Sequence, residues 1–466
     1  MSDQAWVNRL LDAADSPLDD DDDAGLVIDL VIDTVAVAAG ARQRNVGAAG
    51  LDATAISPLP NGAAHVWGGA GTTAPMQAAF LNGTAAEALD YQEVMIDGRN
   101  NGHAAVVIVP TLIALAQDRG IAGTRLVQAL NIAFVANLVL LRALGRGHRA
   151  GTVGFRTTSL GAPIAAALGG GYLLGLNRSQ TAHAVAIAAS ALPAGLLAAM
   201  SPLNGSYSDD KDVAIGLGAQ HAVQSVLLAE AGATGPASPI TGHRGWLASY
   251  GFDTARPEIL AETLPERAVR SYAIKRYPAN FGCQAVIRAA LALRDQTAID
   301  DIDEVRIRVK TSSAQSLSTK KIVNHLAARF SLAYAVASAL ARGRCVLDDF
   351  EPPALSDPIV LKLIDRCTIE DDVNLEAIHQ DRGVFPGHVS IRRRGDSEIE
   401  AGFEGPWNGV SEAERSAGLT AKLHDLLGKE GTTVAAELQR IGETEGLQAL
   451  NAALNRLSTG GAVVAA

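Results

Sequence analysis

Apolar residues recur at helical spacing through the first half of the chain, with breaks that contain Gly, Arg or Pro. Apolar positions three and four residues apart predict helices that bury at least one face. We expect helices at 26–37, 77–89, 104–116, 126–144, 159–176, 179–200 and 212–231. Most of these segments are apolar around nearly their whole circumference. They should therefore lie inside a bundle of several layers.

The pattern changes beyond residue 264. Short segments at 273–277, 304–310 and 389–393 alternate apolar and polar residues, which predicts half-exposed strands. Helical runs lie between them at 284–294, 331–341 and 358–363, so antiparallel pairing in an α+β domain is favoured over a wound parallel sheet. The chain then returns to helix at 412–427, 433–441 and 447–457.

These elements predict a mostly α fold. A large all-helical domain is built from both chain ends, residues 1–268 and 405–466, and a smaller α+β lid domain, residues 269–404, is inserted between them. The chain has 466 residues of which 48% are apolar, enough for a large core, and only 4% are aromatic. Abundant Ala and Gly favour closely packed helices.

Charge and cysteine usage restrict the partners and the compartment. A net charge of −11 argues against a nucleic-acid partner. Three cysteines without a pairing pattern favour a reducing compartment, and no leader signal precedes Trp6, so we expect a cytoplasmic protein. Segment 159–176 is apolar enough to span a membrane. Pro163 and the lack of aromatic anchors favour a buried helix instead, so no membrane association is expected.

Sequence motifs give little support to metal, phosphate or hydrolase chemistry. The ten histidines are scattered, without HExxH or a Cys/His cluster, so no metal site is expected. Gly169, Gly170 and Gly171 lack the spacing of a phosphate loop and fit close helix packing better. No GxSxG elbow is present. Acid/base catalysis by side chains remains, without a cofactor.

Asp90 and His103 are the first candidates for that chemistry. Asp90 follows an Ala-rich helix and begins a polar segment, 90–102, that we expect to be a loop. His103 ends this loop where the next helix starts, and a helix N-terminus lowers the pKa of an imidazole and favours the neutral base. The alternative is a helix-entry histidine without a role. The neighbouring carboxylate favours a functional one.

Cations at two further places suggest a small anionic substrate. Lys211 stands in an aspartate cluster before a helix, where capping explains the aspartates but not a lysine that opposes the helix dipole. The segment 275–280 contains Lys275, Arg276, Tyr277 and Asn280 at a domain junction, a favoured place for ligands. A solvated strand end is the alternative for this segment.

Several short motifs recur in combination over most of the chain: Leu-Asp-Tyr with a later His (Asp90, Tyr91, His103), Gly-Phe-x-Thr (154–157), a Lys before a Gly- and Ala-rich helix (Lys211), Ala-Gly-x-x-Gly-Pro (231–236), Lys-x-Tyr-Pro (275–278) and Phe-Ser-Leu-x-Tyr-Ala-Val-Ala (330–337). In these the chain resembles the MmgE/PrpD superfamily, which includes 2-methylcitrate dehydratase and cis-aconitate decarboxylase. The resemblance implies a homodimer, a helical domain and a smaller lid domain that enclose the site, and no required cofactor.

The chain departs from that pattern at three places. Dehydratase-like members usually read Asp-Asp-Thr-His where this chain has Gln92-Glu93-Val94-Met95, and His where it has Arg156. Decarboxylase-like members carry His near the position of Asn280. Dehydration must protonate a departing hydroxyl, and these changes remove proton donors. Epimerisation has no leaving group.

Within the resemblance we therefore expect a cofactor-independent epimerase of iminodisuccinate, which carries four carboxylates. That charge would account for five cations: Arg99, Arg156, Lys211, Lys275 and Arg276. A hydro-lyase of a 2-hydroxy polycarboxylate, similar to 2-methylcitrate dehydratase, is the alternative. A helical protein that only binds polycarboxylates is the third hypothesis.

The expected roles follow from this chemistry. His103, oriented by Asp90, would remove the α-proton, and Lys275 or Tyr277 would serve the opposite face. Lys211 belongs with the catalytic group and, like Arg156 and Arg276, would bind carboxylates that gain charge in the transition state. Further residues expected to contact substrate are Tyr91, Arg99 and Asn280.

Overall fold

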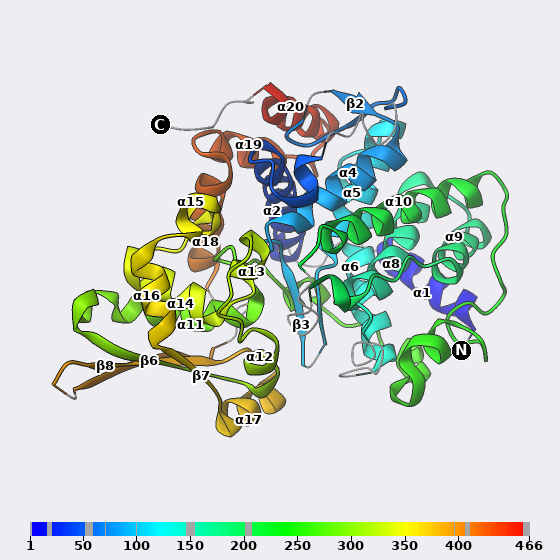
Figure 1. Cartoon of the computed structure of the whole chain (residues 1–466). Helices are drawn as coiled ribbons and strands as arrows, with labels where there is room; N and C mark the ends of the chain where they lie inside the picture. The colour runs from blue at the N-terminus through cyan, green and yellow to red at the C-terminus, as the bar shows by residue number, and fades with distance from the viewer. Residues whose placement is uncertain are drawn as a thin grey trace. The chain divides into compact units, whose positions relative to one another are not determined.

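The computed structural model describes residues 2–15, 21–51, 59–69, 71–98, 100–145, 154–200, 207–395, 397–405 and 411–459 (Figure 1). The fold is mostly helical, as the sequence predicts. Two compact units divide the chain. Unit 1 comprises Met1–Leu197, Asp209–Ile274 and Leu419–Ala466, and unit 2 comprises Ala198–Ser208 and Lys275–Gly418. That unit 2 acts as a lid stays a prediction.

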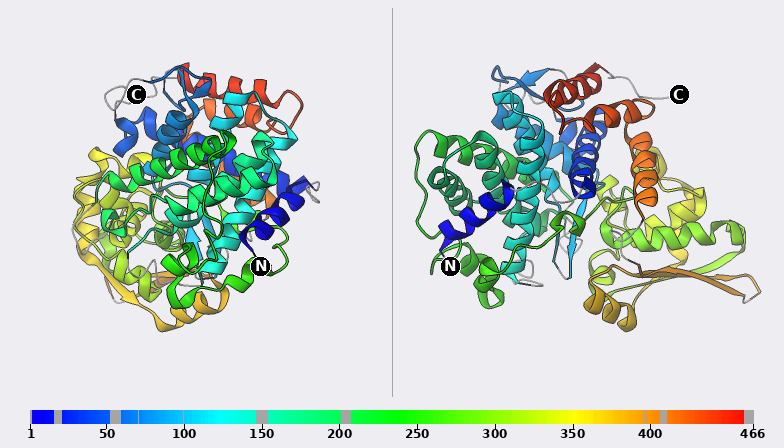
Figure 2. Two further views of the ribbon diagram at one scale, coloured as in Figure 1. Left: turned by 90° about the vertical axis from the view of Figure 1, so that its right-hand side faces the viewer. Right: turned by 180° about the vertical axis from the view of Figure 1, so that it is seen from behind.

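Unit 1 is a layered helix bundle (Figure 2). Its helices are α1 (Asp3–Ala14), α2 (Asp21–Gln43), α4 (Pro75–Ala88), α5 (Ala105–Arg119), α6 (Thr124–Leu144), α8 (Thr157–Leu174), α9 (Arg178–Ser190), α10 (Asp210–Glu230), α19 (Glu430–Leu438) and α20 (Gly446–Thr459). Most of them lie where the apolar pattern predicts a helix, but α1 was not predicted and the helix predicted at 179–200 ends at Ser190. Helix α18 (Glu412–Leu427) runs across the boundary at 418/419. A two-residue ladder pairs β1 (Ala64–His65) with β2 (Thr72–Thr73).

Small residues set how closely the central helices pack. Gly216 of α10 faces α4, where an added Cβ would lie 2.1 Å from Thr84 Oγ1 and 2.5 Å from the Phe80 carbonyl oxygen. Any side chain at this position would force the helices apart. Every residue of α8 from Thr158 to Leu173 is buried, which confirms the buried helix predicted at 159–176.

By length and composition two other helical segments could cross a membrane. They are Asp23–Gln43 and Thr124–Leu144; an apolar window of 18 residues is 78% buried within the protein in the first and 83% buried in the second. A mostly buried helix in the core of a bundle passes the same test, so these helices by themselves do not decide the question.

A three-stranded antiparallel sheet, β4-β3-β5, lies within unit 1. Strands β3 (Val94–Asp97) and β4 (Asn100–Gly102) form a hairpin, so the loop predicted at 90–102 is wrong for most of its length. Strand β5 (Tyr272–Ala273) pairs with β3, and therefore does not open the second unit as the prediction for 273–277 had it. Strands of two to four residues are too short for an alternating pattern to reveal.

The hairpin is fixed to the helices by side chains. Asp97 of β3 receives two hydrogen bonds of 2.8 Å from the Arg142 guanidinium of α6. The Tyr272 hydroxyl of β5 donates to the carbonyl oxygen of Phe134, also in α6, at 2.9 Å. The hairpin that leads to His103 is thereby held in one position.

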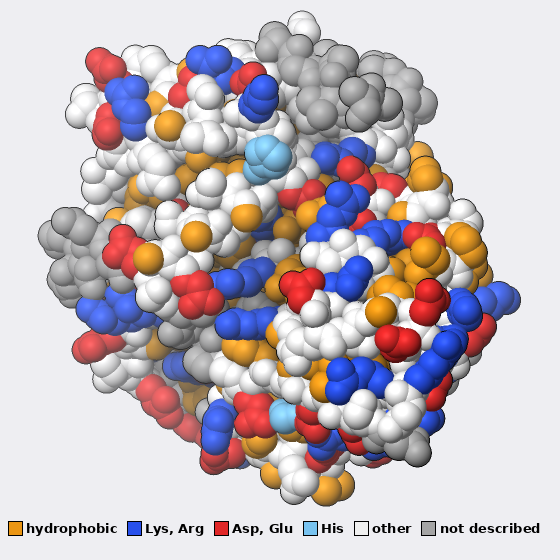
Figure 3. Space-filling model, turned by 90° about the vertical axis from the view of Figure 1, so that its left-hand side faces the viewer, with side chains coloured by type: hydrophobic (Ala, Val, Ile, Leu, Met, Phe, Trp, Pro, Cys, Tyr) orange, Lys and Arg blue, Asp and Glu red, His pale blue; other side chains and the backbone are white. Residues whose placement is uncertain are grey.

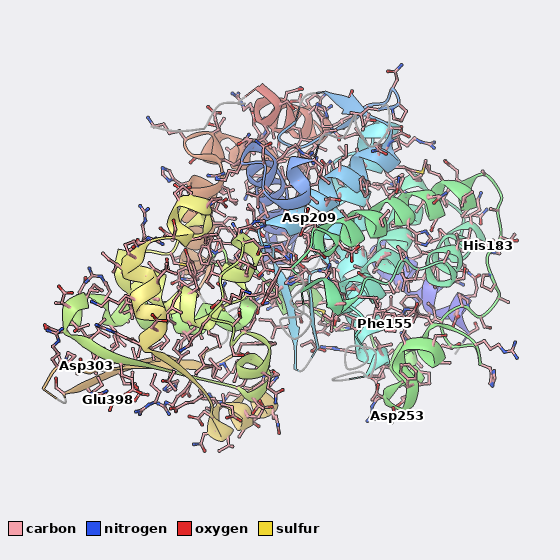
Figure 4. The ribbon with its side chains drawn as sticks, in the orientation of Figure 1. Phe155, His183, Asp209, Asp253, Asp303 and Glu398 are labelled. Atoms are coloured by element: carbon pink, nitrogen blue, oxygen red, sulfur yellow. The ribbon has the colours of Figure 1, made fainter. Side chains whose placement is uncertain are left out.

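Unit 2 is α+β. Its sheet has the order β7-β6-β8-β9, from β6 (Ile302–Val309), β7 (Cys367–Asp371), β8 (Gly387–Arg393) and β9 (Glu398–Phe403). The strands predicted at 304–310 and 389–393 are confirmed as β6 and β8, which pair antiparallel, whereas β6 and β7 are parallel. Figure 4 labels Asp303 on β6 and Glu398 on β9, near one end of this sheet.

Helices cover one face of the unit 2 sheet. Its helices are α11 (Gln284–Leu293), α12 (Thr311–Ser316), α13 (His325–Arg329), α14 (Leu332–Arg342), α15 (Pro352–Leu355), α16 (Pro358–Arg366) and α17 (Val373–Arg382). The core contains Val305, Ile307 and Val389 from the strands and Leu293 and Val336 from the helices. Figure 3 shows basic and acidic side chains interspersed over the side of the molecule that it draws.

Candidate functional site

The last turn of α4 and the residues after it supply the centre of the site in unit 1. Leu89 caps the helix, and Asp90 then takes a left-handed backbone conformation with φ 50°. Asp tolerates this conformation better than most residues because its short side chain can hydrogen-bond locally. Glu87, inside the last turn of α4, is fully buried. The end of α4 therefore directs two carboxylates, Glu87 and Asp90, into the protein.

Glu87 forms the hub of a buried charge cluster. Its Oε1 lies 2.5 Å from Arg156 Nη2 and 3.0 Å from Lys211 Nζ, while Oε2 accepts a 2.7 Å hydrogen bond from Gln92. Burial alone would raise the pKa of Glu87, but the charges of Lys211 and Arg156 lower it to about 2. Glu87 is therefore ionised at neutral pH.

Lys211 occupies the first turn of α10, just beyond Asp209, which Figure 4 labels. Its ammonium donates to the Glu87 carbonyl oxygen at 2.9 Å and lies 3.7 Å from Asp90 Oδ1 and 3.6 Å from Asp212 Oδ1. Burial would lower the pKa of Lys211, yet the carboxylates raise it above its ordinary value. These buried carboxylates explain why a lysine stands where the helix dipole opposes it.

His103 lies between β4 and α5, and two hydrogen bonds hold it. Its backbone N–H donates to Thr158 Oγ1 at 2.9 Å, and its ring Nδ1 lies 2.5 Å from the backbone carbonyl oxygen of Glu93. A carbonyl can only accept, so Nδ1 carries the hydrogen and Nε2 carries the lone pair in the neutral ring. The Glu93 carboxylate in turn accepts from the first N–H of α5, that of Ala105, at 3.0 Å. The ring is thus set as a base at Nε2.

The structure adds detail to two predicted roles. The described bond that orients the His103 ring comes from the Glu93 backbone, and the predicted orienting role of Asp90 stays a prediction. That Arg156 and Lys211 bind substrate carboxylates also stays a prediction. Both are nearly fully buried and already paired with Glu87, a carboxylate that the sequence analysis did not select. The sequence contains one indication of Glu87: it is the single acidic residue within the Ala-rich segment 77–89.

Tyr91 is also buried, and Lys422 of α18 covers it. The Lys422 ammonium lies 4.2 Å from the centre of the Tyr91 ring and 2.5 Å from Asp33 Oδ1, and it donates to the Tyr91 carbonyl oxygen. Tyr91 is therefore part of the framework next to Asp90. Its predicted contact with substrate stays a prediction.

The remaining predicted residues belong to unit 2, except Arg99, which lies outside the described residues. Lys275 is buried, and Arg276 pairs with Glu414 at 3.0 Å. Burial raises the pKa of Tyr277 despite the nearby Arg276 and Arg288. Asn280 accepts a hydrogen bond from the N–H of Gly282 at 3.0 Å. That these residues meet His103 stays a prediction.

Metal ligands do not gather in the part of the chain that the structure describes: no group of three or more His, Cys, Asp or Glu residues is suitably placed. The three cysteines, Cys283, Cys345 and Cys367, are buried and unbridged.

Three features define the class of protein. The first unit is mostly helical, the second is α+β, and a buried acid/base cluster surrounds Glu87 and His103. The chain belongs to the MmgE/PrpD family: the family's N-terminal domain matches residues 21–257 and its C-terminal domain matches residues 277–445.

Two relatives are named for an enzyme activity. Human cis-aconitate decarboxylase is 24% identical over 312 residues, which are 64% of this chain and 61% of the human protein. The cis-aconitate decarboxylase-like protein oryM of Aspergillus oryzae is 27% identical over 349 residues, 68% of this chain and 67% of the relative. The match thus spans less than two thirds of the human enzyme. Membership of this enzyme family supports the prediction that the protein is an enzyme.

Proposed function

We propose that the protein is a cofactor-independent enzyme that removes a proton from a carbon beside a carboxylate, and that it epimerises iminodisuccinate. One observation carries the proposal: the Glu93 carbonyl fixes the His103 tautomer so that Nε2 is the basic nitrogen. A base aligned by its other ring nitrogen is what proton abstraction needs.

In the proposed reaction the α-carbon–hydrogen bond breaks and its proton passes to His103 Nε2. The bonding electrons move into the adjacent carboxylate and give an enediolate, so charge accumulates on a group that is already anionic. The Glu93 carbonyl then stabilises the imidazolium through its bond with Nδ1. A new proton on the opposite face completes the inversion.

Lys275 or Tyr277 would supply the proton on the opposite face. Burial raises the pKa of Tyr277, so the phenol keeps its hydrogen at neutral pH and suits the donor role. Both residues lie in unit 2, and their approach to the α-carbon is part of the proposal.

Arg156 supports epimerisation over loss of water. It replaces a histidine of the dehydratase-like pattern, and it is buried against the Glu87 carboxylate. A guanidinium does not release a proton at neutral pH, so Arg156 cannot protonate a departing hydroxyl.

A hydro-lyase of a 2-hydroxy polycarboxylate, similar to 2-methylcitrate dehydratase, is the alternative. It shares the first proton transfer, and the family and the lyases among the relatives favour it. A homodimer and a cytoplasmic location belong to the same proposal.

The test is incubation of the purified protein with iminodisuccinate, 2-methylcitrate or cis-aconitate in deuterium oxide. We expect the α-proton signal of iminodisuccinate to disappear and its stereoisomers to interconvert, followed by NMR and chiral chromatography. An unsaturated product from 2-methylcitrate without exchange in iminodisuccinate would favour the hydro-lyase. Release of carbon dioxide from cis-aconitate alone would favour a decarboxylase. No reaction with any of the three would overturn the proposal.

A further inference from the structure

A polycarboxylate needs more cations than the cluster in unit 1 can offer. The charges of Arg156 and Lys211 are already balanced there by Glu87 and its neighbours. In unit 2, Arg276 is paired with Glu414. The carboxylates of the substrate therefore call for a further cation.

Lys310 is a buried cation of a different kind. It follows β6 and is only 6% exposed, yet no carboxylate of the described residues lies within 4.0 Å of its ammonium. Lys211, Lys422 and Arg329 are comparably buried, and each has a carboxylate partner within that distance. An unpaired charge is costly to bury, so a position of this kind suits an anionic ligand.

The described contacts of Lys310 leave hydrogen-bond donors available for such a ligand. The ammonium donates to Ser312 Oγ and lies 4.6 Å from the centre of the Phe385 ring. A lysine ammonium has three N–H donors, and one hydroxyl and one aromatic ring do not use them all. Ser312 is exposed, so the ammonium lies just beneath the protein surface.

Glu376 is the charged neighbour that favours the protonated form of Lys310, but the two residues form no ion pair. Its carboxylate oxygens accept hydrogen bonds from the Thr311 N–H at 3.1 Å and from Gln380 at 3.0 Å. His379 packs on Phe385 and directs Nδ1 to the Val384 carbonyl oxygen. Burial lowers the pKa of Lys310 to about 8 against the opposing effect of Glu376, as expected for a cation short of a counter-charge.

The surroundings of Lys310 include a residue next to segment 275–280, which the sequence analysis selected for substrate binding. Phe281, next to Asn280, packs edge-on against Phe385 with ring centres 4.9 Å apart. Gly282 lies between Asn280 and Ser313. A Cβ added at Gly282 would lie 2.9 Å from Ser313 Oγ and 3.4 Å from Asn280 Oδ1. The polar groups of segment 280–282 and of 310–313 thus border the same aromatic pair.

We propose that Lys310, with the Ser312 hydroxyl, is a carboxylate-binding subsite of unit 2 that holds one carboxylate of the polycarboxylate substrate. The inference deepens the proposed function and rests on it for the identity of the substrate. It needs only a carboxylate ligand, whatever reaction follows.

Amine acetylation at pH 8 tests the subsite in the full-length wild-type protein, read out at each lysine by mass spectrometry. Citrate and iminodisuccinate are the probes. We expect either probe, at about ten times its Kd or more, to reduce acetylation of Lys310 about tenfold, because the occupied subsites are shielded from the reagent. Lys362, an exposed lysine of α16, should be acetylated equally with and without the probes. Equal acetylation of Lys310 in all samples would overturn the inference.

Kinetics of Lys310→Gln give a second readout. We expect KM for the polycarboxylate to rise about 10- to 100-fold with little change in kcat, because binding common to ground and transition states is lost. Lys310→Arg should recover part of the loss, and Lys362→Gln is the charge-matched control. A KM like that of the control would contradict the subsite.

The two proposals fail separately. Protection of Lys310 by citrate without α-proton exchange in iminodisuccinate would leave the subsite standing and remove the epimerase. Exchange without protection of Lys310 would leave the epimerase and remove the subsite.

Discussion

Nδ1 of His103 donates a hydrogen bond to the main-chain carbonyl oxygen of Glu93, 2.5 Å away. The two residues are ten positions apart along the chain, and the β3–β4 hairpin brings them together. The same glutamate caps α5 through its side chain, so one residue holds both the helix start and the His103 ring. Its carbonyl decides which ring nitrogen is basic.

Replacing His103 should remove proton exchange without unfolding the protein. His103→Asn keeps a donor near the position of Nδ1 but has no base at Nε2. We expect exchange of the substrate α-proton with deuterium oxide to fall about 10²- to 10⁴-fold, the usual contribution of general-base catalysis, with an unchanged circular dichroism spectrum. We expect the same loss of α-proton exchange for His103→Gln. Wild-type exchange in a folded variant would show that another residue is the base.

Glu87→Gln should strongly destabilise unit 1. It leaves Arg156 and Lys211 buried without the carboxylate that both contact. Breaking a buried pair typically costs about 3–5 kcal/mol in the free energy of unfolding. Urea denaturation measures this cost. Glu230→Gln is the control, because it breaks an exposed pair with Arg119 and should cost less than about 1 kcal/mol. Equal effects of the two substitutions would refute the hub role of Glu87.

Asp212 should make the protein less stable as the pH rises. Burial raises its pKa to about 6 from 3.8, although Lys211 opposes the shift. The folded state therefore binds this proton more tightly than the unfolded state. The stabilisation is present below pH 4 and is lost as the pH rises through 6. The loss amounts to about 3 kcal/mol, since each pKa unit corresponds to about 1.4 kcal/mol.

Asp212→Asn isolates this effect from that of other carboxylates. Asparagine can still accept from the Ala48 N–H, which lies 3.4 Å from Asp212 Oδ2. We expect the unfolding free energy of the variant, relative to wild type, to increase between pH 4 and pH 7. A difference that does not vary with pH would mean that Asp212 titrates normally.

Lys422→Met should damage the framework beneath Asp90. Asp33 would stay buried without its cation, and the Tyr91 carbonyl would lose a donor. We expect a loss of about 3–5 kcal/mol in urea denaturation. The double variant Asp33→Asn/Lys422→Met should lose less than the sum of the single variants, since neither buried charge remains. Strict additivity would show that the pair is not coupled.

The sequence by itself determined the helical part of this protein. Apolar spacing predicts α4, α5, α6, α8 and α10 because the period of a helix is a local property, and an all-round apolar segment such as α8 must lie inside. The same local pattern predicts β6 and β8, whose residues alternate over enough positions to be recognised. The sequence also indicated His103, Asp90 and Lys211 as candidates, since polar residues stand out where such segments end; their roles stay predictions.

Only the tertiary structure decided how those residues pair. Glu87 and Arg156 are 69 positions apart in the chain, and Glu87 and Lys211 are 124 apart, so no spacing relates them. The hairpin that turns the Glu93 carbonyl towards His103 depends on anchors to α6 from β3 and β5. A carboxylate buried between two cations and a ring fixed by a backbone carbonyl are consequences of packing. The fold therefore decides whether a cation can bind substrate or instead balances a buried charge.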